Sequence, residues 1–146
     1  MYGLTPDVAM GSSRDFGLRP AMQLRSALYL VKDVPAGTPV GYGATEVTSR
    51  DTKLGVVTMG YADGIPRVAK NAGIWINGKR APIIGRVSMD LITVDVTHLP
   101  QVPRSLDILG PNQSVDDLAA RAGTIGYNIL TALGPRYQRR YSNGAA

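Results

Sequence analysis

The sequence predicts a mainly β fold, namely a small closed or partly closed β-barrel with a short two-helix insert near the C-terminus. Three observations support this fold class. Apolar runs of strand length recur between residues 21 and 109, an Asn-Gly pair separates two of them, and helical patterns occur only after residue 113. With 146 residues, of which 44% are hydrophobic and 18% charged, the chain is long enough for one domain with its own core.

The expected strands are short and are joined by turns. Asn77-Gly78 follows the apolar "IWI" and predicts a two-residue hairpin, because both central positions of such a turn need positive φ. The long run that starts at Lys79 carries apolar residues on both faces and is expected to be a strand buried on both sides. The expected strands are residues 21–31, 54–61, 74–76, 79–97, 105–109 and 135–141.

Two helices are expected before the final strand. Ser114 is a good N-cap and Gly123 a stop signal, which together predict a helix over residues 114–123. Thr124 is the expected cap of a second helix over residues 124–135, which ends at a Gly-Pro pair. Residues 1–20, in contrast, are dense in Gly, Pro, Ser and Asp and are expected to be loop.

Composition excludes several kinds of site. The chain has no Cys and one His, so we expect no metal site, no disulfide and no cysteine nucleophile. His98 is expected at the surface. The formal charge is +5, and the basic residues are dispersed until "PRYQRRY" (135–141), which holds three arginines. A single basic cluster is weak evidence, so we expect no nucleic-acid partner, and a basic nucleic-acid-binding barrel stays as an alternative function. No run of about 18 apolar residues occurs, and we therefore expect no membrane partner.

Three glycine-containing stretches are the candidates for chemistry. Taken singly, each is typical of a turn or a hairpin, and Arg86 and Asp90 could simply pair with each other. Together they place two loop tyrosines near two arginines, and guanidinium charge would lower the pKa of a phenol from its usual value of about 10. The stretches are "GYGAT" (41–45), "GYADGIPR" (60–67) and "GRVSMD" (85–90).

These stretches, followed by "AGTIGYNILTALGPRYQRRY", resemble the C-terminal domain of alanine racemase, a pyridoxal-phosphate enzyme. The resemblance covers essentially the whole chain in the right order, and the combination of "GYADG" with "GRVSMD" is highly specific. "MYGLTP" resembles the segment that leaves the family's β/α barrel. We therefore expect residues 1–20 to be a linker from an upstream barrel and residues 21–146 to be the β-domain. The lysine that holds pyridoxal phosphate as a Schiff base belongs to that barrel.

The resemblance implies a catalytic role for Tyr42. It matches the family's base for the α-proton of L-alanine, while the barrel lysine serves the opposite face. The implied reaction is two-base interconversion of L-alanine and D-alanine in the cytoplasm. In the family the active site forms across a homodimer, so Tyr42 would reach the cofactor of the partner, and the isolated domain is expected to be inactive.

Further positions follow from the same resemblance. The backbone N–H of Met89 matches the group that holds the substrate carboxylate, Tyr61 lies at the mouth of the substrate channel, and Tyr127 matches the tyrosine that bonds the cofactor phosphate. The channel-lining or supporting positions are Arg67, Arg86 and Asp90. Gly126 and Asn128 replace an Asn and a Glu common in the family, which leaves the hydrogen bonds around Tyr127 open. A free-standing β-barrel that acts as a binding or dimerisation module remains the alternative function.

Overall fold

The computed structural model describes residues 3–6, 8–11, 13–69 and 73–142. Within these residues, six strands form the main sheet, accompanied by a pair of very short strands, two α-helices and three single turns of 3-10 helix (η). In chain order the elements are η1 Val8–Met10, β1 Leu24–Val34, β2 Pro39–Val40, η2 Tyr42–Ala44, β3 Glu46–Val47, β4 Thr52–Val57, η3 Tyr61–Asp63, β5 Gly73–Ile76, β6 Lys79–Pro82, β7 Ile92–Asp95, β8 Ser105–Leu109, α1 Val115–Arg121 and α2 Gly126–Ala132.

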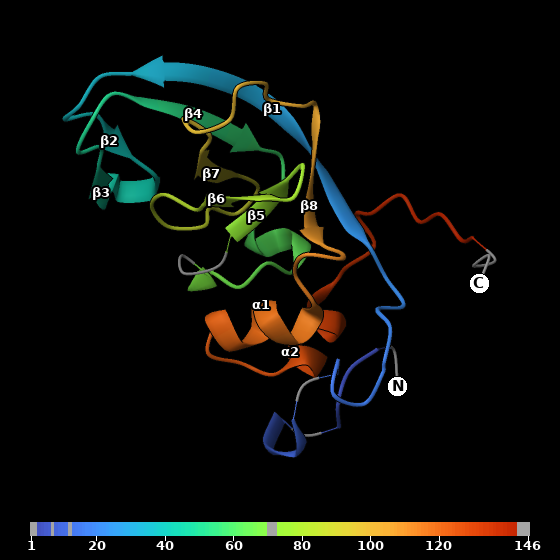
Figure 1. Cartoon of the computed structure of the whole chain (residues 1–146). Helices are drawn as coiled ribbons and strands as arrows, with labels where there is room; N and C mark the ends of the chain where they lie inside the picture. The colour runs from blue at the N-terminus through green and yellow to red at the C-terminus, as the bar shows by residue number, and fades with distance from the viewer. Residues whose placement is uncertain (1–2, 7, 12, 70–72, 143–146) are drawn as a thin grey trace.

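The main sheet curls into a nearly closed barrel, as predicted. Its strand order is β6-β5-β8-β1-β4-β7, and all neighbours are antiparallel. The long strand β1 pairs with β8 through its first half and with β4 through its second half, which bends the sheet around (Figure 1). Ile83, which follows β6, bridges to Val94 in β7, so the two edges of the sheet meet.

The β5–β6 hairpin confirms the turn expected at Asn77-Gly78. Their φ values are 49° and 75°, which are both in the left-handed region that this tight turn requires. The turn sets the register of the hairpin, in which Ile76 faces Lys79. Local sequence was sufficient to predict this element because the conformational requirement lies in the two turn residues themselves.

The core fills the barrel and continues down onto the two helices. Apolar side chains from β4, β5, β7 and β8 are buried with those of α1 and α2 in one cluster. Leu4 belongs to the same cluster and is 1% exposed, although it lies in the segment expected to be loop. Figure 1 shows α1 and α2 together below one end of the barrel. None of the helices in the described residues is long and apolar enough to cross a membrane.

The two helices begin in different ways. Ser114 caps α1 as predicted: its hydroxyl accepts the N–H of Asp117 at 3.0 Å, and the Asp117 carboxylate accepts the N–H of Ser114 at 3.0 Å. For α2 the expected cap at Thr124 is wrong, because Ile125 occupies the N-cap position and makes no side-chain cap bond. The Thr124 hydroxyl instead accepts a hydrogen bond from Nδ2 of Asn128 at 2.8 Å.

Two strand predictions need correction. The single strand expected over residues 79–97 is divided into β6 and β7, because the chain leaves the sheet at Gly85, whose φ is 75°. The final strand expected over 135–141 does not form. Arg136 and Tyr137 in that stretch instead use their side chains to bind Asp63, the last residue of η3. In both places long-range contacts override a local pattern that favours a strand.

Candidate functional site

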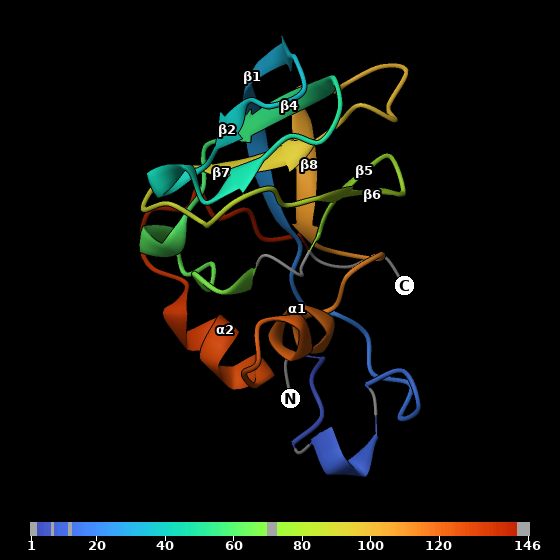
Figure 2. The ribbon, with the colours of Figure 1, turned by 90° about the vertical axis from the view of Figure 1, so that its left-hand side faces the viewer.

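Three loops that lie far apart in the sequence meet on one side of the barrel. We name them the first loop (residues 41–45), the second loop (60–67) and the third loop (85–90). Figure 2 shows η2 of the first loop and η3 of the second loop on the same side, with α2 below them. These are the three glycine-containing stretches that the sequence singled out, and the fold brings them into contact.

The first and third loops touch through two glycines. A Cβ on Gly41 would lie 3.1 Å from the Cα of Gly85, and a Cβ on Gly85 would lie 3.1 Å from the Cα of Gly41. Both residues also have positive φ, 82° and 75°. Gly41 is therefore needed both for its conformation and for the close approach of the two backbones, whereas Gly43 has ample space and is needed only for its φ of 73°.

The second and third loops are joined even more closely. The N–H of Tyr61 donates to the carbonyl of Ser88 at 3.0 Å, and the N–H of Ala62 donates to the carbonyl of Met89 at 2.9 Å. At Gly60 a Cβ would lie only 2.3 Å from both of these carbonyl oxygens. The backbone on either side of Met89 is therefore held by the start of η3.

Asp63 connects the second loop to the C-terminal segment. One carboxylate oxygen, Oδ2, accepts the N–H of Gly60 at 2.9 Å, and the other, Oδ1, accepts Nη1 of Arg136 at 3.3 Å. Its backbone carbonyl accepts the hydroxyl of Tyr137. Arg136 also donates through Nη1 to Asp90 Oδ1 at 2.8 Å. This hydrogen bond to Asp90, together with the charges of Asp63 and Asp90, raises the pKa of the Arg136 guanidinium.

The side chains with predicted roles are exposed around these contacts. The exposed fractions are 69% for Tyr42, 42% for Tyr61, 53% for Met89 and 37% for Tyr127. Arg67 and Arg86 are also exposed, and within the described residues their side chains make no hydrogen bond or ion pair. The local pairing of Arg86 with Asp90 that remained open from the sequence is wrong, because Asp90 pairs with Arg136.

Tyr127 lies on a different element from the other predicted residues. It is in the first turn of α2, and its carbonyl accepts the hydroxyl of Thr131 at 2.8 Å. The other end of α2 packs against the second loop: a Cβ on Gly64 would lie 2.5 Å from the carbonyl oxygen of Ala132. The helix that carries Tyr127 is thus attached to the same group of loops.

The sequence assigns no role in the site to three residues that connect its loops, namely Asp63, Arg136 and Tyr137. The Arg136–Asp63 pair is separated by 73 positions, so no local spacing could connect the two residues. The nearest signal in the sequence is that an arginine and a tyrosine are adjacent in the "PRY" stretch.

The arrangement offers two kinds of chemistry. The Tyr42 hydroxyl is an exposed phenol that can give or take a proton. In the described part of the chain the backbone N–H of Met89 makes no hydrogen bond, so it is free to donate to an anionic ligand. For pyridoxal phosphate, the exposed Tyr127 phenol is a suitable donor to a phosphate oxygen. The three loops contain no lysine that could hold this cofactor covalently.

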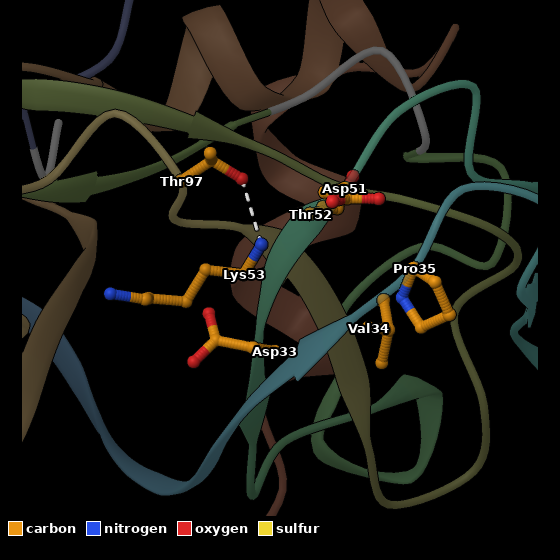
Figure 3. A pocket seen from close by; sticks show the side chains of 7 residues that line it. All are labelled: Asp33, Val34, Pro35, Asp51, Thr52, Lys53 and Thr97. Carbon is orange, nitrogen blue, oxygen red and sulfur yellow. Dashed lines mark hydrogen bonds between the residues drawn. The ribbon is translucent and has the colours of Figure 1, made fainter.

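A pocket at another place in the fold holds none of these residues. It lies at the end of β1 next to the start of β4, and it is lined by Asp33, Val34, Pro35, Asp51, Thr52, Lys53 and Thr97 (Figure 3). The N–H of Lys53 donates to the Thr97 hydroxyl at 2.8 Å there. The pocket and the three loops are therefore separate features of the molecule.

The Tyr137 hydroxyl gives the site a measurable pH dependence. Burial, and then the charge of Asp63, raises the pKa of Tyr137 to about 12. In the unfolded chain the value is about 10, so this phenol stabilises the fold below that pH and the contribution is lost as the pH rises further. We expect Tyr137→Phe to reduce the loss of stability between about pH 10 and pH 12.

Unfolding in urea at a series of pH values checks this prediction. Tyr141→Phe is the matched control, because Tyr141 is 89% exposed in the same segment. Equal slopes of stability against pH for the parent and Tyr137→Phe would contradict it.

Fold and site together define a small β-barrel domain with two C-terminal helices that presents tyrosine, methionine and arginine side chains on three adjoining glycine loops. The model of the alanine racemase C-terminal domain family matches residues 21–141. The chain therefore belongs to the alanine racemase C-terminal domain family.

Similar proteins agree with this membership. The alanine racemase of Cereibacter sphaeroides is 50% identical over 143 residues, which are 97% of this chain and 41% of that protein. The alanine racemase of Stutzerimonas stutzeri is 46% identical over 97% of this chain and 40% of that protein. The chain thus spans about two fifths of the length of these relatives.

Solved structures share the fold. The alanine racemase of Streptomyces lavendulae superposes with a TM-score of 0.90 at 42% identity, over 98% of this chain and 39% of that chain. The Bartonella henselae enzyme, which contains covalently bound pyridoxal phosphate, superposes with a TM-score of 0.87 at 33% identity. The match covers 97% of this chain and 39% of that chain. The Bacillus anthracis enzyme, with bound L-Ala-P, superposes with a TM-score of 0.81 at 31% identity. The match covers 91% of this chain and 36% of that chain.

Proposed function

We propose that this chain is the base-donating C-terminal domain of an alanine racemase and that the complete enzyme interconverts L-alanine and D-alanine in the bacterial cytoplasm. One observation carries the proposal: the loop of Tyr42 packs directly against the loop of Met89, while both side chains stay exposed. A phenol and a backbone N–H donor are thereby offered from adjoining loops. Membership of the family and the names of the relatives support the choice of alanine.

Tyr42 is the proposed base for one face of the substrate. Racemisation needs one group to remove the α-proton and another to return a proton on the opposite face. In this proposal the Tyr42 hydroxyl oxygen exchanges a proton with Cα of L-alanine. The lysine of the upstream barrel acts on the D-face. The exposure of Tyr42 fits this role, because a base must project away from its own loop to reach a substrate held elsewhere.

The third loop is proposed to bind the substrate carboxylate. The backbone N–H of Met89 donates to it, and Tyr61 on the second loop lies at the mouth of the proposed substrate channel. Arg67, Arg86 and Asp90 lie further out along the proposed channel. The free amide of Met89 and the exposure of Tyr61 support these assignments.

The proposed cofactor is pyridoxal phosphate, bound mainly by the upstream barrel. When bound, it supplies the electron sink that acidifies the α-proton of the amino acid. From this chain, the Tyr127 hydroxyl donates to its phosphate. The pyridoxal phosphate in the Bartonella henselae enzyme and the L-Ala-P in the Bacillus anthracis enzyme support this cofactor and this substrate class.

The site is proposed to be completed in a homodimer, in which Tyr42 of one copy reaches the cofactor of the other. Large apolar side chains are exposed in the three loops, within two residues of them and at the start of α2, and these support an interface with another surface. They are Tyr42, Val47, Tyr61, Val68, Met89, Leu91, Ile125 and Tyr127.

The proposal can be tested by joining this chain to the upstream part of the Cereibacter sphaeroides relative, in place of the matching segment of that protein. We expect the joined protein, loaded with pyridoxal phosphate, to racemise alanine. The 146-residue chain alone is expected to be inactive. Turnover by the chain alone would refute the two-domain assignment. A correctly folded, cofactor-loaded joined protein without turnover would instead favour a free-standing binding or dimerisation module.

A further inference from the structure

We propose that Arg136 is a positioning residue for the substrate carboxylate: it holds the second and third loops together, so that the Met89 amide keeps the orientation needed for binding. The inference rests on the proposed function, because the role of the Met89 amide comes from it. Arg136 itself would not touch the substrate. It would act through the two aspartates that it binds.

The ion pairs place one cation between two anions. A single nitrogen of Arg136, Nη1, lies 2.8 Å from Asp90 Oδ1 and 3.3 Å from Asp63 Oδ1. Asp90 directly follows Met89 in the third loop, and Asp63 ends η3 in the second loop. The guanidinium therefore brings two carboxylates from different loops to the same point, which two like charges would not occupy without it.

The contacts around Met89 allow the Arg136 guanidinium to affect the backbone conformation of the third loop. The Met89 carbonyl and the preceding Ser88 carbonyl are held by N–H groups of the second loop. On the C-terminal side of Met89 the Leu91 carbonyl accepts the N–H of Ser88 at 3.0 Å, and the Asp90 side chain is the anchor that depends on Arg136. Asp63 cannot easily move away, because its second carboxylate oxygen accepts the Gly60 N–H and its carbonyl accepts the Tyr137 hydroxyl. If Arg136 is removed, repulsion from Asp63 acts mainly on Asp90.

Removing the Arg136 guanidinium should have a larger effect than the loss of one exposed ion pair. Arg136 and Asp90 are about half exposed, and such a pair by itself contributes little to stability. The expected effect comes from the two carboxylates left facing each other. Removing the charge of Asp90 as well should therefore restore the orientation of the third loop, although it removes a second member of the ion-pair group.

The test uses the active joined protein described above, with L-alanine as substrate. For Arg136→Met we expect KM to rise about tenfold with kcat changed less than about twofold, since carboxylate binding is shared by ground state and transition state. Arg136→Lys should lie between the parent and Arg136→Met, because a lysine ammonium lacks the forked donors of arginine. The double variant Arg136→Met with Asp90→Asn should recover most of the rise in KM. Arg139→Met, in the same exposed segment, is the matched control and should leave both constants unchanged.

Two results would overturn the inference: a KM for Arg136→Met equal to that of the parent, or a double variant no better than the single one. A readout without turnover separates this inference from the proposed function. In the 146-residue chain, amide hydrogen exchange at Tyr61 and Ala62 should be at least about tenfold faster in Arg136→Met than in Arg139→Met. If the joined protein without substitutions has no racemase activity, the proposed function is refuted. If the amide hydrogen exchange rates at Tyr61 and Ala62 do not change in Arg136→Met, the loop contact made by Arg136 is refuted.

Discussion

Tyr42→Phe is expected to abolish the exchange of the α-proton of L-alanine with deuterated solvent in the joined, cofactor-loaded protein, while D-alanine continues to exchange. The substitution removes a single hydroxyl oxygen, the proposed base on one face. Loss of a positioned general base lowers rates by roughly 10²- to 10⁴-fold. Because Tyr42 is 69% exposed, the fold should be unaffected and the loss should be confined to chemistry on the L-face.

Proton NMR of each enantiomer in deuterated buffer measures this effect directly. Tyr29→Phe is the matched control, since Tyr29 is a more exposed tyrosine, at 76%, and belongs to β1 rather than to any of the three loops. It should not change the exchange of either enantiomer. If both enantiomers exchange in Tyr42→Phe as they do in the parent, Tyr42 is only a loop residue and the catalytic assignment fails.

Gly60→Ala is expected to lower the free energy of unfolding by about 3 kcal/mol or more, which is at the upper end for overpacking. The reason is that the added Cβ would lie 2.3 Å from the carbonyl oxygens of Ser88 and Met89, which are backbone atoms held in hydrogen bonds. The second and third loops must separate to make room. The joined protein should therefore lose alanine binding as well as stability.

Urea denaturation of the 146-residue chain checks the change in stability. Gly134→Ala is the matched control: no atom lies within 4 Å of a Cβ at Gly134, and its φ is not in the left-handed region. Its free energy of unfolding should stay within about 0.5 kcal/mol of the parent value, as for most surface substitutions. A Gly60→Ala variant as stable as Gly134→Ala would show that the two loops are not packed as described.

Elements with local determinants were predicted correctly from the sequence. The β5–β6 turn needs two residues that tolerate positive φ, and Asn77-Gly78 meets this need without help from the rest of the chain. The N-cap of α1 is similarly local, because Ser114 and Asp117 bond to each other's backbone. The mainly β class followed from recurrent apolar runs, and the six-stranded, nearly closed sheet confirms it.

Predictions failed where distant contacts decide the conformation. Residues 84–91 have the alternation of a strand, but Gly85 packs on Gly41 and the segment turns out of the sheet. There a local strand preference of a fraction of a kcal/mol is smaller than the free energy of packing against the neighbouring segment. The expected cap at Thr124 failed for a different and local reason: its hydroxyl is engaged by Asn128, four positions away, and Ile125 takes the N-cap position.

For the site, the sequence by itself determined which residues were available: Tyr42, Tyr61 and Met89 in glycine-containing loops, in a chain with no cysteine and one histidine. It also carried the resemblance that assigned their roles. Only the tertiary structure decided that the three loops share one side of the barrel and that Arg136 joins Asp63 to Asp90. The physical reason is that close backbone approach and ion pairing depend on distances in space, and these partners are separated by more than forty positions along the chain.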